Sequence, residues 1–151
     1  MSQDDVVMLL RQINSAFPID SRTVPERIST LSLSQMYLLD ELYAMAQNGY
    51  ETLSLSALTQ DLGFSKATIS ATLKVLRKLG YINMQIDNDD NRRKKIILTE
   101  RAQEVKPDVQ QYVADFNRGI CKGISGRELR SFEKTLSMVL QNMRDIRARG
   151  P

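Results

Sequence analysis

The stretch "SKATISATLKVLRKLGYI", residues 65–82, reads as a helix with another helical pattern directly before it and strand patterns directly after it. Few folds place three such elements so close together in sequence. Ser65 is a preferred N-cap residue and Gly80 tolerates the positive φ at which many helices end, so a helix is expected between them. Residues 56–62 also have a helical pattern, which stops at Gly63. Only Gly63 and Phe64 separate the two helices, and so short a turn sets them at a steep angle.

Strand patterns follow this pair of helices directly. The segments "YINMQI" and "KKIIL" have β character and flank the polar segment "DNDDNRR". This order predicts a β-hairpin with a long, charged turn.

Helical patterns occupy the rest of the chain. Apolar residues recur at helical spacing over residues 4–16, 32–49, 99–124 and 125–147. Two of these helices begin with a capping box, Ser32 with Gln35 and Ser125 with Glu128, and a kink is expected at Pro107. The predicted fold is mainly α with a small β-hairpin wing: a winged helix-turn-helix with N- and C-terminal helices, in a single domain over residues 1–151.

Composition excludes several classes of function. The chain has no histidine and a single cysteine, which excludes a Ser-His-Asp or Cys-His enzyme and an intrachain disulfide. No metal or cofactor is expected, because the sequence has neither a metal-ligand spacing nor a phosphate-binding glycine loop. No apolar run is long enough to span a membrane, and the N-terminal "MSQDDVVMLL" is acidic, so we expect a cytoplasmic protein.

The helix that follows Ser65 has two different faces. On a helical wheel Ile69, Leu73 and Leu76 share the core-facing side, and no acidic residue occurs between Ser65 and Gly80. Small side chains opposite the core would let the helix lie deep in a major groove, while lysines and the free amides of the helix N-terminus would attract phosphates. The predicted DNA-contacting residues are Ser65, Lys66, Ala67, Thr68, Ser70, Ala71, Lys74 and Lys78.

A basic helix face alone is weak support for DNA binding, because most such faces are only solvated. The neighbouring hairpin strengthens the interpretation. The net charge is only +3, yet residues 92–95 at the hairpin are all basic. Two adjacent basic elements fit a protein that contacts a groove and the flanking backbone together.

Taken in order, these segments resemble the MarR (multiple antibiotic resistance regulator) family of bacterial transcription factors. "LSLSALTQDLGFSKATISATLKVLRKLGYI" looks like the helix-turn-helix of that family, and "DNRRKKIILT" is similar to its wing. "LTERAQEVKP" and "GISGRELRSFEKTLSMVLQNM" look like the start of its fifth helix and the whole of its sixth. The similarity covers residues 31–146, most of the chain.

The resemblance implies a homodimer bound to double-stranded DNA. Residues 1–30 and 100–147 would form the dimerisation helices and residues 31–99 the DNA-binding lobe, with its wing in the minor groove. Arg92 would be the wing arginine and Asp90 the carboxylate that orients it, although such a pair is equally a surface salt bridge. The predicted wing residues are Asn88, Asp90, Asn91, Arg92, Arg93 and Lys94.

Many relatives bind a small aromatic effector, so the resemblance also raises the question of a pocket. Candidates to line it are Met8, Met36, Tyr37, Tyr43 and Met45, but a methionine and aromatic pattern is more often plain core. Cys121 is expected in a terminal helix, buried as a small apolar residue rather than acting as a redox sensor.

The predicted function is a sequence-specific transcriptional regulator, expected to be a repressor. It would bind a pseudo-palindromic operator as a homodimer, and a small-molecule effector could release it. The alternative is a winged-helix module for protein–protein interaction that binds no specific DNA.

Overall fold

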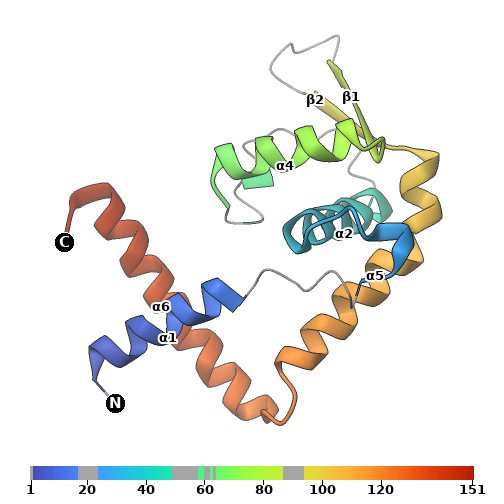
Figure 1. Ribbon diagram of the computed structural model, residues 1–151. Coiled ribbons are helices and arrows are strands. Elements are labelled where there is room, and N and C mark those ends of the chain that lie inside the picture. The colour runs from blue at the N-terminus through green and yellow to red at the C-terminus, as the bar shows by residue number, and fades with distance from the viewer. Residues whose placement is uncertain (1, 17–23, 49–57, 60–61, 63, 87–93) are drawn as a thin grey trace. The chain divides into compact units, whose positions relative to one another are not determined.

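The structure is a computed structural model of the 151-residue chain, and it describes residues 2–16, 24–48, 58–59, 62, 64–86 and 94–151. The elements in chain order are α1 (Gln3–Ala16), the 3-10 helix η2 (Glu26–Ile28), α2 (Leu33–Gln47), α4 (Lys66–Lys78), β1 (Ile82–Ile86), β2 (Lys94–Leu98), α5 (Glu100–Ile120) and α6 (Gly126–Arg149) (Figure 1). The chain divides into two compact units, Met1–Val113 and Ala114–Pro151. The predicted mainly helical fold with a two-stranded hairpin is confirmed.

Helix α2 lies at the centre of the core. Ser32 begins it with the predicted capping box: its hydroxyl accepts from the Gln35 amide at 3.2 Å, and its own amide donates to the Gln35 side chain at 2.9 Å. Apolar side chains then cover most of the helix surface, which is expected for a helix with neighbours on several sides. The buried residues of α2 are Leu33, Met36, Leu38, Leu39, Leu42, Tyr43 and Met45.

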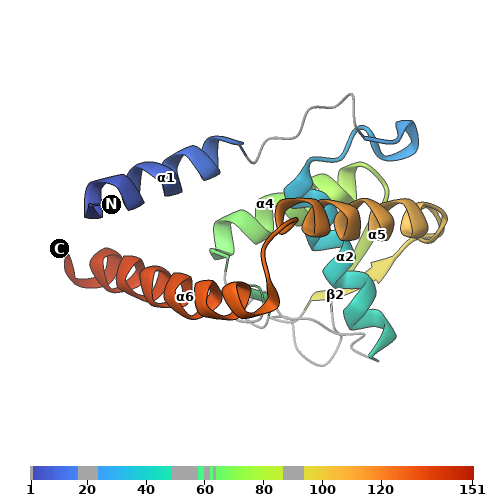
Figure 2. The same cartoon turned by 90° about the horizontal axis from the view of Figure 1, so that it is seen from below.

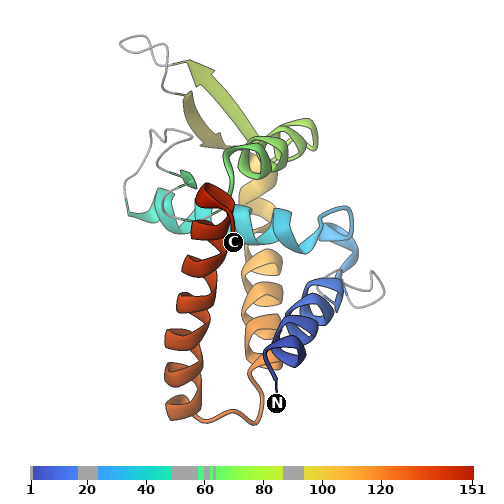
Figure 3. The same cartoon turned by 90° about the vertical axis from the view of Figure 1, so that its left-hand side faces the viewer.

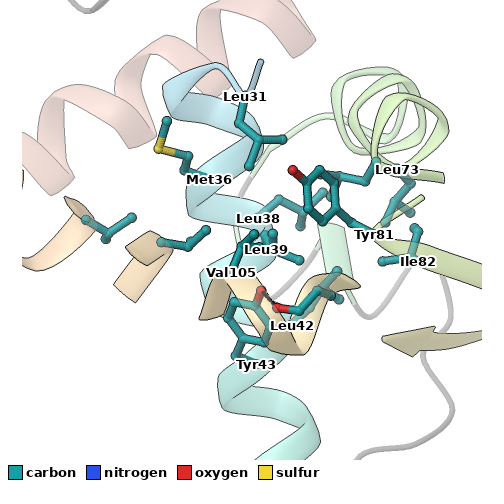
Figure 4. Packing of buried hydrophobic residues seen from close by; sticks show 14 of the residues in the cluster. Leu31, Met36, Leu38, Leu39, Leu42, Tyr43, Leu73, Tyr81, Ile82 and Val105 are labelled. Carbon is teal, nitrogen blue, oxygen red and sulfur yellow. Dashed lines mark hydrogen bonds between the residues drawn. The ribbon is translucent and has the colours of Figure 1, made fainter. Parts of the chain in front are cut away.

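Helices α4 and α5 complete this core with the start of the hairpin. Figure 4 shows Leu73 of α4, Tyr81 and Ile82 at the hairpin, and Val105 of α5 gathered around α2. The Tyr43 hydroxyl donates to the Ala102 carbonyl and so attaches α2 to the first turns of α5. Burial is the main cause of the raised pKa of the Tyr43 hydroxyl, which therefore stays protonated as a donor.

The short helix η2 is also attached to α5. The Arg27 guanidinium donates to the Glu104 carbonyl at 3.1 Å, and its other terminal nitrogen lies 3.4 Å from the Asp108 carboxylate. Ile28 beside it is fully buried. An arginine and an isoleucine thus fix the segment that leads into α2 against one face of α5.

The hairpin is an antiparallel pair in which Ile82 pairs with Leu98 and Ile86 with Lys94. In Figures 2 and 3 its strands connect the end of α4 to the start of α5. The turn between them, predicted to be charged, falls in residues 87–93 outside the described residues. Most of the expected helix over residues 56–62 also falls outside them; Leu58, Thr59 and Leu62 have helical backbone.

The second unit contains the end of α5 and all of α6. The predicted capping box is present, with Glu128 accepting from the Ser125 amide at 2.9 Å. This contact lowers the pKa of the Glu128 carboxyl. The expected extent of α5 was wrong by four residues, because the helix ends at Ile120 and not at 124. Cys121 therefore lies just beyond α5, partly buried, and not within a helix.

Helices α1 and α6 have no buried residue, although each has an apolar face. Their large exposed hydrophobic residues are Val6, Val7, Met8, Leu9 and Ile13 on α1 and Phe132, Leu136, Met138, Leu140, Met143 and Ile146 on α6. Apolar side chains at this density on a surface usually mark a contact with another protein or a membrane. No helix in the described part of the chain is long and apolar enough to cross a membrane.

Candidate nucleic-acid interface

Helix α4 begins at the predicted N-cap. The Ser65 hydroxyl accepts from the Thr68 amide at 3.2 Å and lies 2.9 Å from the Thr68 hydroxyl. It satisfies one of the amides that every helix leaves free in its first turn. The remaining amides and the absence of any acid in that turn give this end of α4 a positive potential.

The core-facing side of α4 is Ile69, Leu73 and Leu76, each at most 3% exposed. These three residues fix the rotation of the helix about its axis, since any other rotation would expose them. As the helical wheel predicts, the side chains opposite are exposed: Ala67, Ser70, Ala71, Lys74 and Lys78. Ser65, Lys66 and Thr68, at the start of the helix, are exposed as well. The face that sequence reasoning assigned to DNA is therefore on the outside of this unit.

Three of the four hydroxyls between Ser65 and Lys78 are bonded within the chain. Ser65 and Thr68 bond to one another, and the Thr72 hydroxyl donates to the Thr68 carbonyl at 2.8 Å. Ser70 has no hydrogen-bond partner within the part of the chain described. Methyl groups surround it, supplied by Ala67 and Ala71, so the surface lets another molecule approach closely.

The charge of this face is uncompensated. Lys66, Lys74 and Lys78 have no ion-pair partner among the residues the structure describes, and α4 contains no carboxylate. Residues four apart on a helix lie one above the other, so Lys66, Ser70, Lys74 and Lys78 form one row. Three lysines in one row give this part of α4 a positive charge of the kind that attracts the phosphates of a duplex.

The turn that ends α4 is held by Thr99, the residue just before α5. Gly80 has φ of +85°, which turns the chain from α4 into β1. The Thr99 hydroxyl donates to the Gly80 carbonyl at 2.6 Å, and the Thr99 amide donates to the Tyr81 carbonyl at 3.1 Å. Two hydrogen bonds thus tie the turn after α4 to the residue that precedes α5.

The wing is only partly described. Lys94 begins β2, and its backbone is paired with Ile86. The other predicted wing residues lie outside the described residues: Asn88, Asp90, Asn91, Arg92 and Arg93. Their contact with DNA, including the proposed Asp90 and Arg92 pair, stays a prediction.

The candidate effector residues are not all alike. Met36, Tyr43 and Met45 are buried in the core, Tyr37 is partly buried against it, and Met8 is exposed on α1. The buried three fit the plainer of the two interpretations, which is core packing. The pocket itself stays a prediction. Within the described residues, no group of three or more cysteine or acidic side chains is placed to hold a metal ion.

Sequence reasoning missed one residue at this site, Arg101. Its guanidinium donates to the Leu79 carbonyl at 2.7 Å, at the end of α4. No periodic pattern identifies such a contact, because Arg101 is on another helix and 22 residues away. The only local signal is its position two residues after the cap residue Thr99.

A capped helix with an exposed, acid-free face, followed by a hairpin, defines a winged helix-turn-helix domain. In agreement, residues 31–102 match the family of winged helix DNA-binding domains.

Solved structures with the same fold are transcription regulators. A MarR regulator from Oenococcus oeni PSU-1 is 17% identical with a TM-score of 0.64, over 90% of this chain and 96% of its own. A MarR family regulator from Listeria monocytogenes, complexed with 26mer DNA, is 21% identical with a TM-score of 0.65, over 96% and 90%. The MepR–DNA complex of S. aureus is 20% identical with a TM-score of 0.68, over 89% and 94%. The chain has the fold of the MarR-family transcriptional regulators, and the expected resemblance is confirmed.

Proposed function

We propose that this protein is a sequence-specific DNA-binding regulator of transcription that acts as a homodimer. The observation that carries the proposal is the outward face of α4. It is exposed, free of acids and lined by small residues and lysines, in a domain that matches a winged helix DNA-binding family. Two of the structures that share its fold are complexes with DNA.

In the proposed complex α4 enters the major groove. Ala67 and Ala71 allow the helix to approach the base edges, where the Ser70 hydroxyl would bond. Lys66, Lys74 and Lys78 neutralise phosphates along the groove wall. The hairpin that follows brings Lys94 and the basic residues before it to the flanking minor groove, and Arg92 is proposed to enter that groove.

The homodimer is proposed from the apolar faces of α1 and α6. Phe132 is 54% exposed and Met138 is 61% exposed in one subunit, which is costly for a protein that remains a monomer. A second copy of the chain would cover these faces. Two copies of α4 would then address two half-sites about one helical turn apart, since dimer symmetry is matched by operator symmetry.

Regulation would be steric in the simplest scheme. A dimer that occupies a promoter excludes polymerase, so we expect the protein to repress transcription. It would act in the cytoplasm, where bacterial DNA lies. Release by a small aromatic effector would need a site other than Met36, Tyr43 and Met45, which are core residues. A thermal-shift screen of aromatic acids would reveal an effector as a rise in the melting temperature.

The proposal is tested by selecting bound duplexes from random DNA and measuring the affinity for the most enriched duplex at several salt concentrations. If three lysines in each subunit contact phosphates, the logarithm of the affinity should fall with the logarithm of salt with a slope of roughly 5. A flat dependence, or no enriched sequence, would refute the proposal. It would favour the alternative, a protein-interaction module in which the helix-turn-helix is only a scaffold.

A further inference from the structure

Arg101 occupies an unusual position for a surface arginine. It is exposed, it lies beside the end of α4, and the default interpretation would be another phosphate contact. Its guanidinium, however, is already engaged: it donates to the Leu79 carbonyl at 2.7 Å, and its central carbon lies 4.9 Å from the centroid of the Tyr81 ring. Among the described residues no carboxylate pairs with it.

The two contacts hold the guanidinium in one place. Tyr81 is fully buried, so its ring is a fixed platform, and Figure 4 shows it packed among the core residues of α2 and α4. A guanidinium can stack on a ring and donate in its own plane at the same time, which an ammonium group cannot do. The Leu79 carbonyl lies at the negative end of the α4 dipole, where a cation is favoured.

Arg101 also lies against the turn that ends α4. A side chain added at Gly80 would meet Arg101 atoms at 3.7 and 3.8 Å. Together with Thr99, Arg101 therefore provides hydrogen-bond donors for three consecutive carbonyls, those of Leu79, Gly80 and Tyr81. All of these donors come from the first residues of α5 and its cap. We call this set of contacts the α4–α5 joint.

We propose that Arg101 is a positioning residue: through the α4–α5 joint it fixes the orientation of α4 on α5 and so determines which half-site spacing the dimer accepts. Helix α5 continues without a break to Ile120, and its last residues belong to the second unit. The inference rests on the proposed function, because half-site spacing has a meaning only for a dimer on DNA.

The test uses the full-length dimer and a panel of duplexes with two copies of the selected half-site, spaced from two base pairs closer to two base pairs wider than the selected distance. Affinity is measured for the wild type, Arg101→Ala, Arg101→Lys and the control Arg118→Ala. Arg118 is an exposed arginine of the same helix whose ion pair, at 3.0 Å, is with Asp115 only one turn away.

With Arg101→Ala we expect affinity at the selected spacing to fall on the order of tenfold, because α4 is then no longer held in one orientation before it binds. Affinity at the other spacings should change little, so the preference for one spacing flattens. The slope of affinity against salt should stay at the wild-type value. Arg118→Ala should behave as the wild type does.

Arg101→Lys separates the two roles even if the alanine variant folds poorly. A lysine keeps the charge that a phosphate contact needs but loses the stacked, planar donor, so a positioning role predicts a flattened spacing preference for both variants. The inference is overturned if the spacing preference is unchanged in both variants. It is also overturned if the lysine variant binds DNA with wild-type affinity while the alanine variant has a salt slope lowered by about 1.8. If the wild type selects no sequence at all, the proposed function fails instead.

Discussion

Replacing Ala71 with glutamate should abolish specific DNA binding while leaving the fold intact. Ala71 is exposed on the outward face of α4, and the core residues of that helix point the other way. Glutamate and alanine differ in helix propensity by only about 0.4 kcal/mol, and surface substitutions usually alter stability by less than about 0.5 kcal/mol. The melting temperature of Ala71→Glu should therefore stay close to that of the wild type.

The loss of binding has a magnitude that follows from the charge placed on this face. At about 8 Å from a phosphate, with an effective dielectric constant of about 20, a carboxylate is repelled by roughly 2 kcal/mol. Two subunits give roughly 4 kcal/mol, which weakens binding about a thousandfold. The introduced carboxylate would also lie one turn from Lys74 and reduce the effective charge of that lysine, which adds to the effect.

The assay is fluorescence anisotropy with the selected duplex, with folding checked by circular dichroism and dimerisation by sedimentation. The matched control is Ala44→Glu, the same substitution at an exposed helical alanine of α2, outside the predicted dimerisation helices. It should bind within about threefold of the wild type. A folded, dimeric Ala71→Glu protein that binds as tightly as its control would refute the assignment of this face, and one that unfolds would show that Ala71 is packed inside the molecule.

Three further predictions concern stability and assembly. Leu76→Ala should lower the free energy of unfolding by about 2–5 kcal/mol in a denaturant titration, because Leu76 is fully buried; a smaller loss would mean that the core is not centred there. Burial raises the pKa of Asp40, so its charged form opposes folding at neutral pH. The melting temperature of Asp40→Asn should therefore exceed that of the wild type at pH 7, and the difference should shrink as pH falls through the raised pKa. A difference that does not depend on pH would contradict this cause. Leu136→Glu should convert the proposed dimer to monomers in sedimentation with little change in helix content. Leu136 is 37% exposed in one subunit and lies on the apolar face of α6 that a second copy would cover. An intact dimer would exclude that face of α6 from the interface.

The parts of the fold that sequence reasoning predicted are those fixed by local chemistry. The capping boxes at Ser32 and Ser125 are predictable because both partners lie within one turn of helix. The end of α5 was missed because Ile120 and Ile124 continue a helical apolar spacing past the true end. In the structure Gly123 has φ of +81°, which reverses the chain there, and a spacing pattern contains no information about φ.

In the candidate site, too, the residues fixed by local pattern were predictable and those fixed by tertiary structure were not. The outward face of α4 follows from a helical wheel, since burying Ile69, Leu73 and Leu76 leaves no freedom about where the other residues point. The contact between Arg101 and Leu79 does not follow from any local pattern. It requires the hairpin to return the chain over 22 residues to the end of α4, and only tertiary structure determines that.

Two kinds of exposed surface in this chain indicate two different partners. On α6 large apolar side chains such as Phe132 and Met138 remain exposed, and water disfavours them, so the surface that covers them must itself be apolar, as a second copy of α6 would be. On α4 the outward face has methyl groups, hydroxyls and lysines, and the helix contains no carboxylate. Burying lysine charges against an apolar protein surface would cost desolvation free energy, whereas pairing them with phosphates releases counterions. The proposed dimer on DNA would cover each surface with the chemistry it requires.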